Sequence, residues 1–482
     1  MRFLADIGVA PLARLAELDP GGKTANRPAA SLREIFLPWT RHTSADFSTR
    51  LELLRRLLER HPGVGFPLLL KLLPQGFDTA TAPSPPQFRE WEHGAEEPVM
   101  TRDYVTFVES IGEELLKESY AQEQWPEIIR HIACFSPEQR QRIRDKIRHW
   151  VPEAAPDRVH EVWSALRALV THDRQFPEVD GVFPAEELQE YSQLADELRP
   201  LDPSARFQWL FKNPWVDIPE DRTKDFQAYD EAVARYRREA VLKTLEFGGL
   251  ATLLELARSC GAPTVLGRSA ATVLDKVEGR DLLDASLGQR DEKLREFALG
   301  FVSEAAIQRG FEWVLGEVER ARSAGWTTES VTDILCASRP GMETWEKVRE
   351  LGTAHWDWYW RNVQIWGLNE PEEVRVAVTE LMRTGRLGAA AELLWIKPEG
   401  IPAQLIMDCL EQLVSVPVSE TEIAQARNAI PTLFERLQKD PDAEEARLAR
   451  LEWIYLEIFG HGNRLPATLH RSLNKSPEFL WS

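Results

Sequence analysis

The chain has 482 residues, of which 43% are hydrophobic and 28% charged, and its 58 basic and 77 acidic side chains give a net charge of −19. This composition excludes a disordered chain, because 17 Trp and 20 Phe are large apolar side chains that must be buried. The negative charge disfavours general binding to nucleic acid or anionic membranes, whose phosphates it repels at long range, but it leaves room for a local basic patch.

The N-terminal residues 1–18 carry Asp6, Arg14 and Glu17 within a modest apolar pattern. Such a pattern is typical neither of a signal peptide nor of a membrane span. The most apolar run, residues 66–73, is interrupted by Lys71 and is too short to cross a bilayer. We therefore expect a cytoplasmic protein without a membrane partner.

A glycine-rich fragment near the N-terminus, Gly21-Gly22-Lys23-Thr24, matches the end of a phosphate-binding loop. The complete motif needs a glycine five positions before Gly22, where this chain has Glu17. Because a carboxylate there would repel phosphate, the fragment favours a turn after a helix over a nucleotide site. We expect no cofactor.

Helical periodicity recurs along the chain. Apolar side chains return at spacings of three and four after Thr101, and again in residues 159–170 and 226–240. Helix start signals at Ser136, Asn369 and Ser419 each place a capping side chain three residues before a Glu or Gln. Alternating strand patterns between hairpin turns are missing. The sequence therefore predicts an all-α protein.

Helix pairs joined by short turns, such as residues 51–73 and 374–396, predict an irregular α-solenoid of HEAT/TPR-like antiparallel helix hairpins without a constant period. Prolines between the first helices and the rest favour extended backbone and predict a linker. The expected parts are an N-terminal helical segment, a Pro-rich linker, a central helical-repeat domain and C-terminal hairpins, at residues 1–78, 79–98, 99–366 and 367–482.

Metal-binding and catalytic motifs are incomplete. Glu127 with His131, and Glu90 with His93, have the spacing of ligand pairs, but neither pair has a matching motif that supplies further ligands. Neither a Gly-x-Ser-x-Gly elbow nor a Cys-x-x-Cys pair is present. We expect no metal site and no enzymatic activity. The cysteines are interpreted as reduced core thiols: Cys134, Cys260, Cys336 and Cys409.

A basic helix expected over residues 140–149 is the strongest local charge anomaly. Its basic side chains are Arg140, Arg142, Arg144, Lys146, Arg148 and His149. Arg140, Arg144 and Arg148 share one stripe, which suits contact with nucleic acid or phosphate. The favoured alternative is the solvated outer face of a repeat helix.

An aromatic stretch in the second half of the chain suits stacking on bases or sugars. On a helix, however, Trp356, Tyr359, Trp360 and Val363 form one face, which is typical of core packing. Trp358 lies on another side of the same helix. We interpret Trp358 as a candidate surface anchor for a partner.

Two segments carry a resemblance. They are residues 19–39, with Asp19-Pro20-Gly21-Gly22 and Pro38-Trp39, and residues 447–479, with Glu452-Trp453-Ile454-Tyr455. These segments resemble helical regions of large, mostly uncharacterised bacterial multidomain proteins of a defence-like (STAND-like) class. The resemblance implies an effector or NTPase module preceding a helical sensor or scaffold, and it transfers no functional residue. The chain is then expected to be a stand-alone partner or one part of a larger protein.

The leading hypothesis is a non-enzymatic helical-repeat scaffold or sensor that binds a protein or peptide, and the resemblance implies a role in bacterial defence. The alternative is a nucleic-acid- or nucleotide-responsive module that uses the basic helix. An enzyme with a dispersed site has no positive support. The candidate interaction residues are Arg140, Arg144, Lys146, Arg148 and Trp358.

Overall fold

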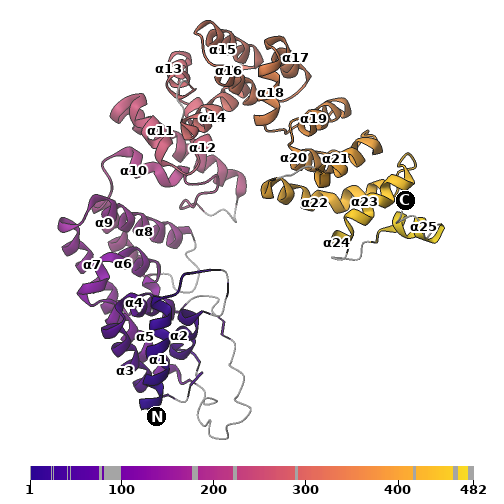
Figure 1. The fold of residues 1–482 in the computed structure, drawn as a ribbon. Coiled ribbons are helices and arrows are strands. Elements are labelled where there is room, and N and C mark those ends of the chain that lie inside the picture. Colours follow the sequence, from indigo (N-terminus) through magenta and orange to yellow (C-terminus); the bar gives the residue numbers. More distant parts are fainter. Residues whose placement is uncertain are drawn as a thin grey trace. The chain divides into compact units, whose positions relative to one another are not determined.

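The computed structural model describes residues 2–22, 24, 27–40, 42–43, 45–74, 79–80, 99–175, 183–220, 225–287, 291–415, 419–459 and 465–475. Within these ranges the regular structure is helical and no strand occurs (Figure 1), which confirms the all-α prediction. No helix in the described part of the chain is long and apolar enough to span a membrane. Most of the predicted linker, together with Glu90, His93 and Lys23, lies outside the described residues.

The chain divides into two compact units, one of residues 1–209 and 215–235 and the other of residues 210–214 and 236–482. The helices within residues 2–211 are α1 (Arg2–Glu17), α2 (Pro28–Phe36), α3 (Phe47–Arg60), α4 (Pro62–Leu72), α5 (Thr101–Leu115), α6 (Glu118–Arg130), η1 (Ile132–Cys134), α7 (Pro137–Trp150), η2 (Val151–Glu153), α8 (Pro156–Gln175), α9 (Ala185–Glu197), α10 (Pro203–Phe207) and η3 (Gln208–Phe211).

The helices that follow are α11 (Phe226–Ser259), α12 (Pro263–Ala271), α13 (Lys276–Leu287), α14 (Glu292–Arg309), α15 (Phe311–Ser323), α16 (Thr328–Cys336), α17 (Met342–Leu351), α18 (Thr353–Asn362), α19 (Pro371–Arg383), α20 (Leu387–Ile396), α21 (Ala403–Ser415), α22 (Glu420–Leu437), α23 (Glu445–Ile454), α24 (Leu456–Phe459) and α25 (Ala467–Lys475). The long helix expected over residues 226–240 is therefore present as the start of α11. Within α11 the backbone is not helical at Gly248 and Gly249, where φ of Gly249 is 66°.

The first unit has one hydrophobic core, which includes residues from both sides of the predicted linker at 79–98. Buried side chains of α4, such as Leu69, and of α5, such as Phe107 and Ile111, belong to the same cluster, and the two helices are in contact. The reason is that the apolar stripe of α5 is buried in part by packing on α3 and α4. The segments 1–78 and 99–209 are thus parts of one unit, and the predicted break at 366/367 lies inside the second.

In the second unit, several hydrogen bonds join residues that are separated in sequence by about the length of one helix hairpin. Gly388 donates its backbone N–H to Glu422, 34 residues later. The side chains of Arg309 and Arg436 each donate to a carbonyl oxygen 35 residues earlier. TPR repeats have about 34 residues. The recurrent spacing is therefore compatible with the predicted solenoid, although the sequence itself shows no fixed period.

The three predicted capping boxes have different outcomes. The box at Ser136 is confirmed, since its hydroxyl accepts from Gln139 N and the Gln139 side chain accepts from Ser136 N. Ser419 accepts from Glu422 N, but the Glu422 side chain caps Gly388 on α20 instead of completing the box. The cap at Asn369 is wrong: α19 has Glu370 at its N-cap without a side-chain hydrogen bond, and Pro371 sets its first turn.

Candidate functional site

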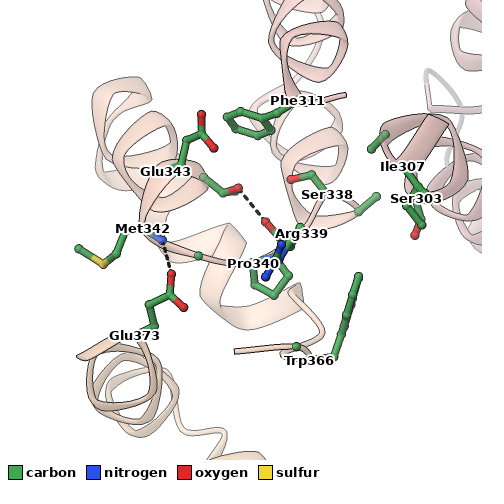
Figure 2. Close-up of a pocket in the computed structure, with 15 residues that line it drawn as sticks. Ser303, Ile307, Phe311, Ser338, Arg339, Pro340, Met342, Glu343, Trp366 and Glu373 are labelled. Atoms are coloured by element: carbon green, nitrogen blue, oxygen red, sulfur yellow. Dashed lines mark hydrogen bonds between the residues drawn. The ribbon is translucent and has the colours of Figure 1, made fainter. Parts of the chain in front are cut away.

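Among the described residues, a groove in the second unit is the best candidate for a binding site. It has a volume of about 590 Å³, within the usual range for ligand pockets. Its lining comes from the end of α14, the start of α15, the α16–α17 connection with the first turn of α17, the segment after α18, and α19. The lining includes Ser303, Ile307, Phe311, Ser338, Arg339, Met342, Glu343, Thr344, Trp366 and Glu373 (Figure 2).

The connection between α16 and α17 forms one wall and is fixed by local hydrogen bonds. The Ser338 hydroxyl donates to the Leu335 carbonyl at 2.7 Å, and the Thr344 hydroxyl donates to the Arg339 carbonyl at 2.8 Å. Glu373 of α19 accepts from the backbone N–H of Met342 at 3.2 Å. A carboxylate from one helix therefore caps the N-terminus of another, which positions this wall.

Apolar side chains stand open to solvent around the groove. Ile307 is 70% exposed, Trp366 is 49% exposed and Met342 is 40% exposed. Phe311 is half-buried and faces the same space (Figure 2). Grouped apolar surface of this kind, bordered by polar residues, marks a binding site more often than scattered single side chains do.

The groove carries few groups suited to catalysis. Its lining contains neither histidine nor cysteine. The hydroxyls of Ser338 and Thr344 already donate to backbone carbonyls, so neither is aligned with a general base. The charged side chains of the lining are Arg339 and Glu343, which are exposed, and Glu373, which is half-buried.

The basic helix is present as α7, but its arginines face acidic side chains. Arg140 binds both carboxylate oxygens of Glu187 on α9, at 2.7 and 2.9 Å. Arg144 binds the same carboxylate at 3.1 Å and Glu190 at 2.6 Å. Burial alone would raise the pKa of Glu187, but the hydrogen bonds from Arg140 and Arg144 bring the pKa below its ordinary value.

This arrangement corrects the predicted solvated face at Arg144, whose side chain is only 5% exposed. The physical reason is that α9 supplies the counter-charges, so the arginine stripe lies against α9. Arg148 pairs with Glu197 at 3.0 Å, and Arg142 pairs with Glu113 of α5 at 2.7 Å. Lys146 is half-buried. The candidate residues are thus brought together on α7, largely in intramolecular ion pairs.

The aromatic stretch forms α18. Tyr359, Trp360 and Val363 are buried, which confirms their predicted core role, while Trp356 is half-buried. Trp358 is half-buried as well, and its indole N–H donates to Asp333 of α16 at 2.8 Å. The predicted anchor therefore has an internal hydrogen-bond partner and does not line the groove.

The remaining candidates have simple structural surroundings. Gly21 has a φ of 82°, and its N–H donates to Asp19, as expected for a turn. Glu127 pairs with Arg130. No group of three or more potential metal ligands occurs among the described residues. The four cysteines are free, with two buried and two half-buried.

Sequence reasoning missed the groove. Ile307 and Trp366 are separated by many residues, and only packing brings α14 beside the segment after α18. One signal was present, because Trp366 follows the end of an aromatic helix without belonging to its apolar face.

The fold and groove define an all-α protein of packed helices with an open, partly apolar recess and no recognisable catalytic constellation in the recess. Comparison of the chain with models of known protein families, with characterised proteins and with solved structures finds no match. The resemblance to defence-like multidomain proteins stays a prediction.

Proposed function

We propose that this protein is a non-enzymatic helical-repeat module that binds a segment of a partner protein in the groove formed by α14, α15, α17 and α19. The observation that carries the proposal is the pair of exposed apolar side chains, Ile307 and Trp366, that line one recess together with the half-buried Phe311. Burying such side chains against a partner releases water from apolar surface and supplies the driving force for association.

The composition of the lining supports a binding role over a catalytic one. A binding groove needs an apolar floor and a few polar groups that fix orientation. Both elements are present, as Phe311 and Trp366 on one hand and Arg339 on the other. The fixed α16–α17 wall adds preorganisation, which lowers the entropic cost of binding.

The alternative function, recognition of nucleic acid by α7, receives less support. Phosphate binding needs arginines whose guanidinium groups are available. Arg140 and Arg144 instead share Glu187 in a partly buried ion-pair network. Using them for phosphate would require exchange of an existing partner.

The proposal is tested with the full chain immobilised and panned against a displayed library of random 12-residue peptides. We expect enrichment of peptides with a large apolar residue, and we expect their binding to drop about 30-fold in Trp366→Ala, the size of a hot-spot loss. Trp395→Ala is the matched control, since Trp395 on α20 is 42% exposed but outside the groove lining. Failure to enrich any peptide that depends on Trp366 would overturn the proposal.

A further inference from the structure

If the groove binds a partner segment as proposed above, the charged side chains of its lining indicate the charge of that segment. The lining holds two carboxylates, Glu343 and Glu373, and one guanidinium, Arg339. We infer that the groove takes a cationic segment of a partner protein, in which a large apolar side chain lies a few residues from a lysine or arginine.

The two carboxylates have acceptor capacity left for a ligand. Glu343 lies in the first turn of α17 and is exposed, and it makes no hydrogen bond or ion pair among the described residues. Glu373 uses Oε1 to accept from Met342 N, which leaves Oε2 for another donor. A carboxylate accepts several hydrogen bonds, so a bound ammonium or guanidinium need not displace the existing cap.

The groove separates its charged and apolar parts. In Figure 2, Glu343 and Glu373 lie on the side of α17 and α19, and Ile307 and Trp366 lie across from them, with Arg339 between. A bound segment would therefore place its apolar anchor against Ile307 and Trp366 and its cation near the carboxylates. Arg339 can donate to the backbone carbonyls of the segment, because guanidinium carries five N–H donors.

Long-range electrostatics act in the same direction. The chain carries a net charge of −19, so a cationic segment is attracted before contact and an acidic one is repelled. This effect raises the association rate chiefly at low salt. The apolar contacts then determine how long the segment stays bound.

The test uses synthetic peptides derived from the library selection and the unaltered full chain. The parent peptide carries the selected apolar anchor with its neighbouring lysines or arginines, and a second peptide replaces these by glutamate. We expect the glutamate peptide to bind at least about fivefold more weakly, which matches the value of one well-placed surface ion pair. We also expect parent binding to weaken between 50 and 500 mM NaCl.

Variants of the protein locate the effect. In Glu343→Lys combined with Glu373→Gln, which keeps an acceptor for Met342 N, the preference between the two peptides should shrink or reverse. Glu346→Lys is the matched control, because Glu346 is exposed on the same helix but outside the groove lining. Equal effects of the two variants would overturn the assignment of the cation to the groove.

The outcomes separate the two proposals. Selected peptides that need Trp366 but show no preference for basic residues would overturn the cationic occupant and leave the binding role standing. If nothing is selected, both proposals fail. If sedimentation shows self-association that Trp366→Ala abolishes, the occupant is a second copy of this chain and the inference is wrong.

Discussion

Arg144 and Arg140 of α7 converge on one carboxylate, that of Glu187 on α9, and Arg144 Nη1 lies 3.1 Å from Glu187 Oε1. The side chains of Arg140 and Glu187 are only 13% and 14% exposed. Arg140 therefore pairs with this carboxylate in a poorly solvated position, and Arg144 shares the carboxylate while also binding Glu190 at 2.6 Å. Loss of that anion leaves Arg140 without its ion-pair partner and leaves Arg144 with Glu190.

Glu187→Gln should lower the free energy of unfolding of the first unit by about 2–3 kcal/mol, because it leaves the poorly solvated Arg140 without its counter-charge and removes one of the two that Arg144 binds. Glu197→Gln is the matched control, since Glu197 pairs with Arg148 where both side chains are about 40% exposed, and such a pair contributes less than about 1 kcal/mol. Urea unfolding followed by tryptophan fluorescence measures both. Similar losses of unfolding free energy in the two variants would show that the ion pairs of Glu187 contribute no more than the exposed pair of Glu197.

Stability should fall as the pH is lowered below about 5. The pKa of Glu187 and that of Glu114 lie below their ordinary values, because hydrogen bonds from Arg140 to Glu187 and from Lys117 to Glu114 outweigh the opposing effect of burial. A carboxyl whose folded pKa is lowered stabilises above its unfolded pKa of about 4.3 and loses this contribution as the pH falls through the folded value.

Urea midpoints measured at pH 7, 5, 4 and 3 should therefore decrease, and the decrease should be shallower in Glu187→Gln, which has no titrating group at this position. A variant curve parallel to that of the unaltered protein would show that Glu187 does not contribute to the acid sensitivity.

Arg167 on α8 is a half-buried cation of a different kind. Its Cζ lies 3.8 Å from the centre of the Trp209 ring, and Nε and Nη1 are buried without a hydrogen-bond partner among the described residues. Burial lowers the pKa of Arg167 to about 10, although Asp217 acts in the opposite direction. Arg167→Met should therefore cost less than about 1 kcal/mol or be stabilising. Arg144→Met is the comparison, and thermal unfolding that ranks Arg167→Met as the more damaging change would contradict this view.

The close approach of α12 and α14 depends on a glycine. A Cβ at Gly267 would overlap the carbonyl oxygen of Phe297, so the helices cannot keep this distance with alanine. Gly267→Ala should cost about 1–3 kcal/mol in unfolding free energy. Gly316→Ala on α15 meets no atom within 4 Å and should gain about 0.5–1 kcal/mol by helix propensity. Chemical denaturation distinguishes the two, and a neutral Gly267→Ala would mean that the helices move apart at little cost.

The sequence was sufficient for features that depend on nearby residues. The helical class, the cap at Ser136 and the burial of Tyr359 and Trp360 follow from spacings within one or two turns. The pairing of Arg140 with Glu187 joins residues 47 apart, and it turned an expected outer face into a contact between helices. Spacing along one helix does not reveal the charge of its neighbour.

The groove and the division into two units could not be predicted from local sequence patterns, because both depend on contacts between residues far apart in the sequence. The proline-rich stretch suggested a domain boundary, yet Leu69 and Ile111 on either side of it share a core. Ile307 and Trp366 come together only once the intervening helices have packed. Periodicity predicts which side of a helix is buried, and it does not identify the helix that covers it.

Calorimetric titration of the full chain with a selected basic and apolar 12-residue peptide tests the central claim most directly. The account predicts one peptide per chain, binding about 30-fold weaker in Trp366→Ala, and unchanged binding in Trp395→Ala. Binding that is indifferent to Trp366→Ala, or lost equally in both variants, would contradict the groove as the binding site.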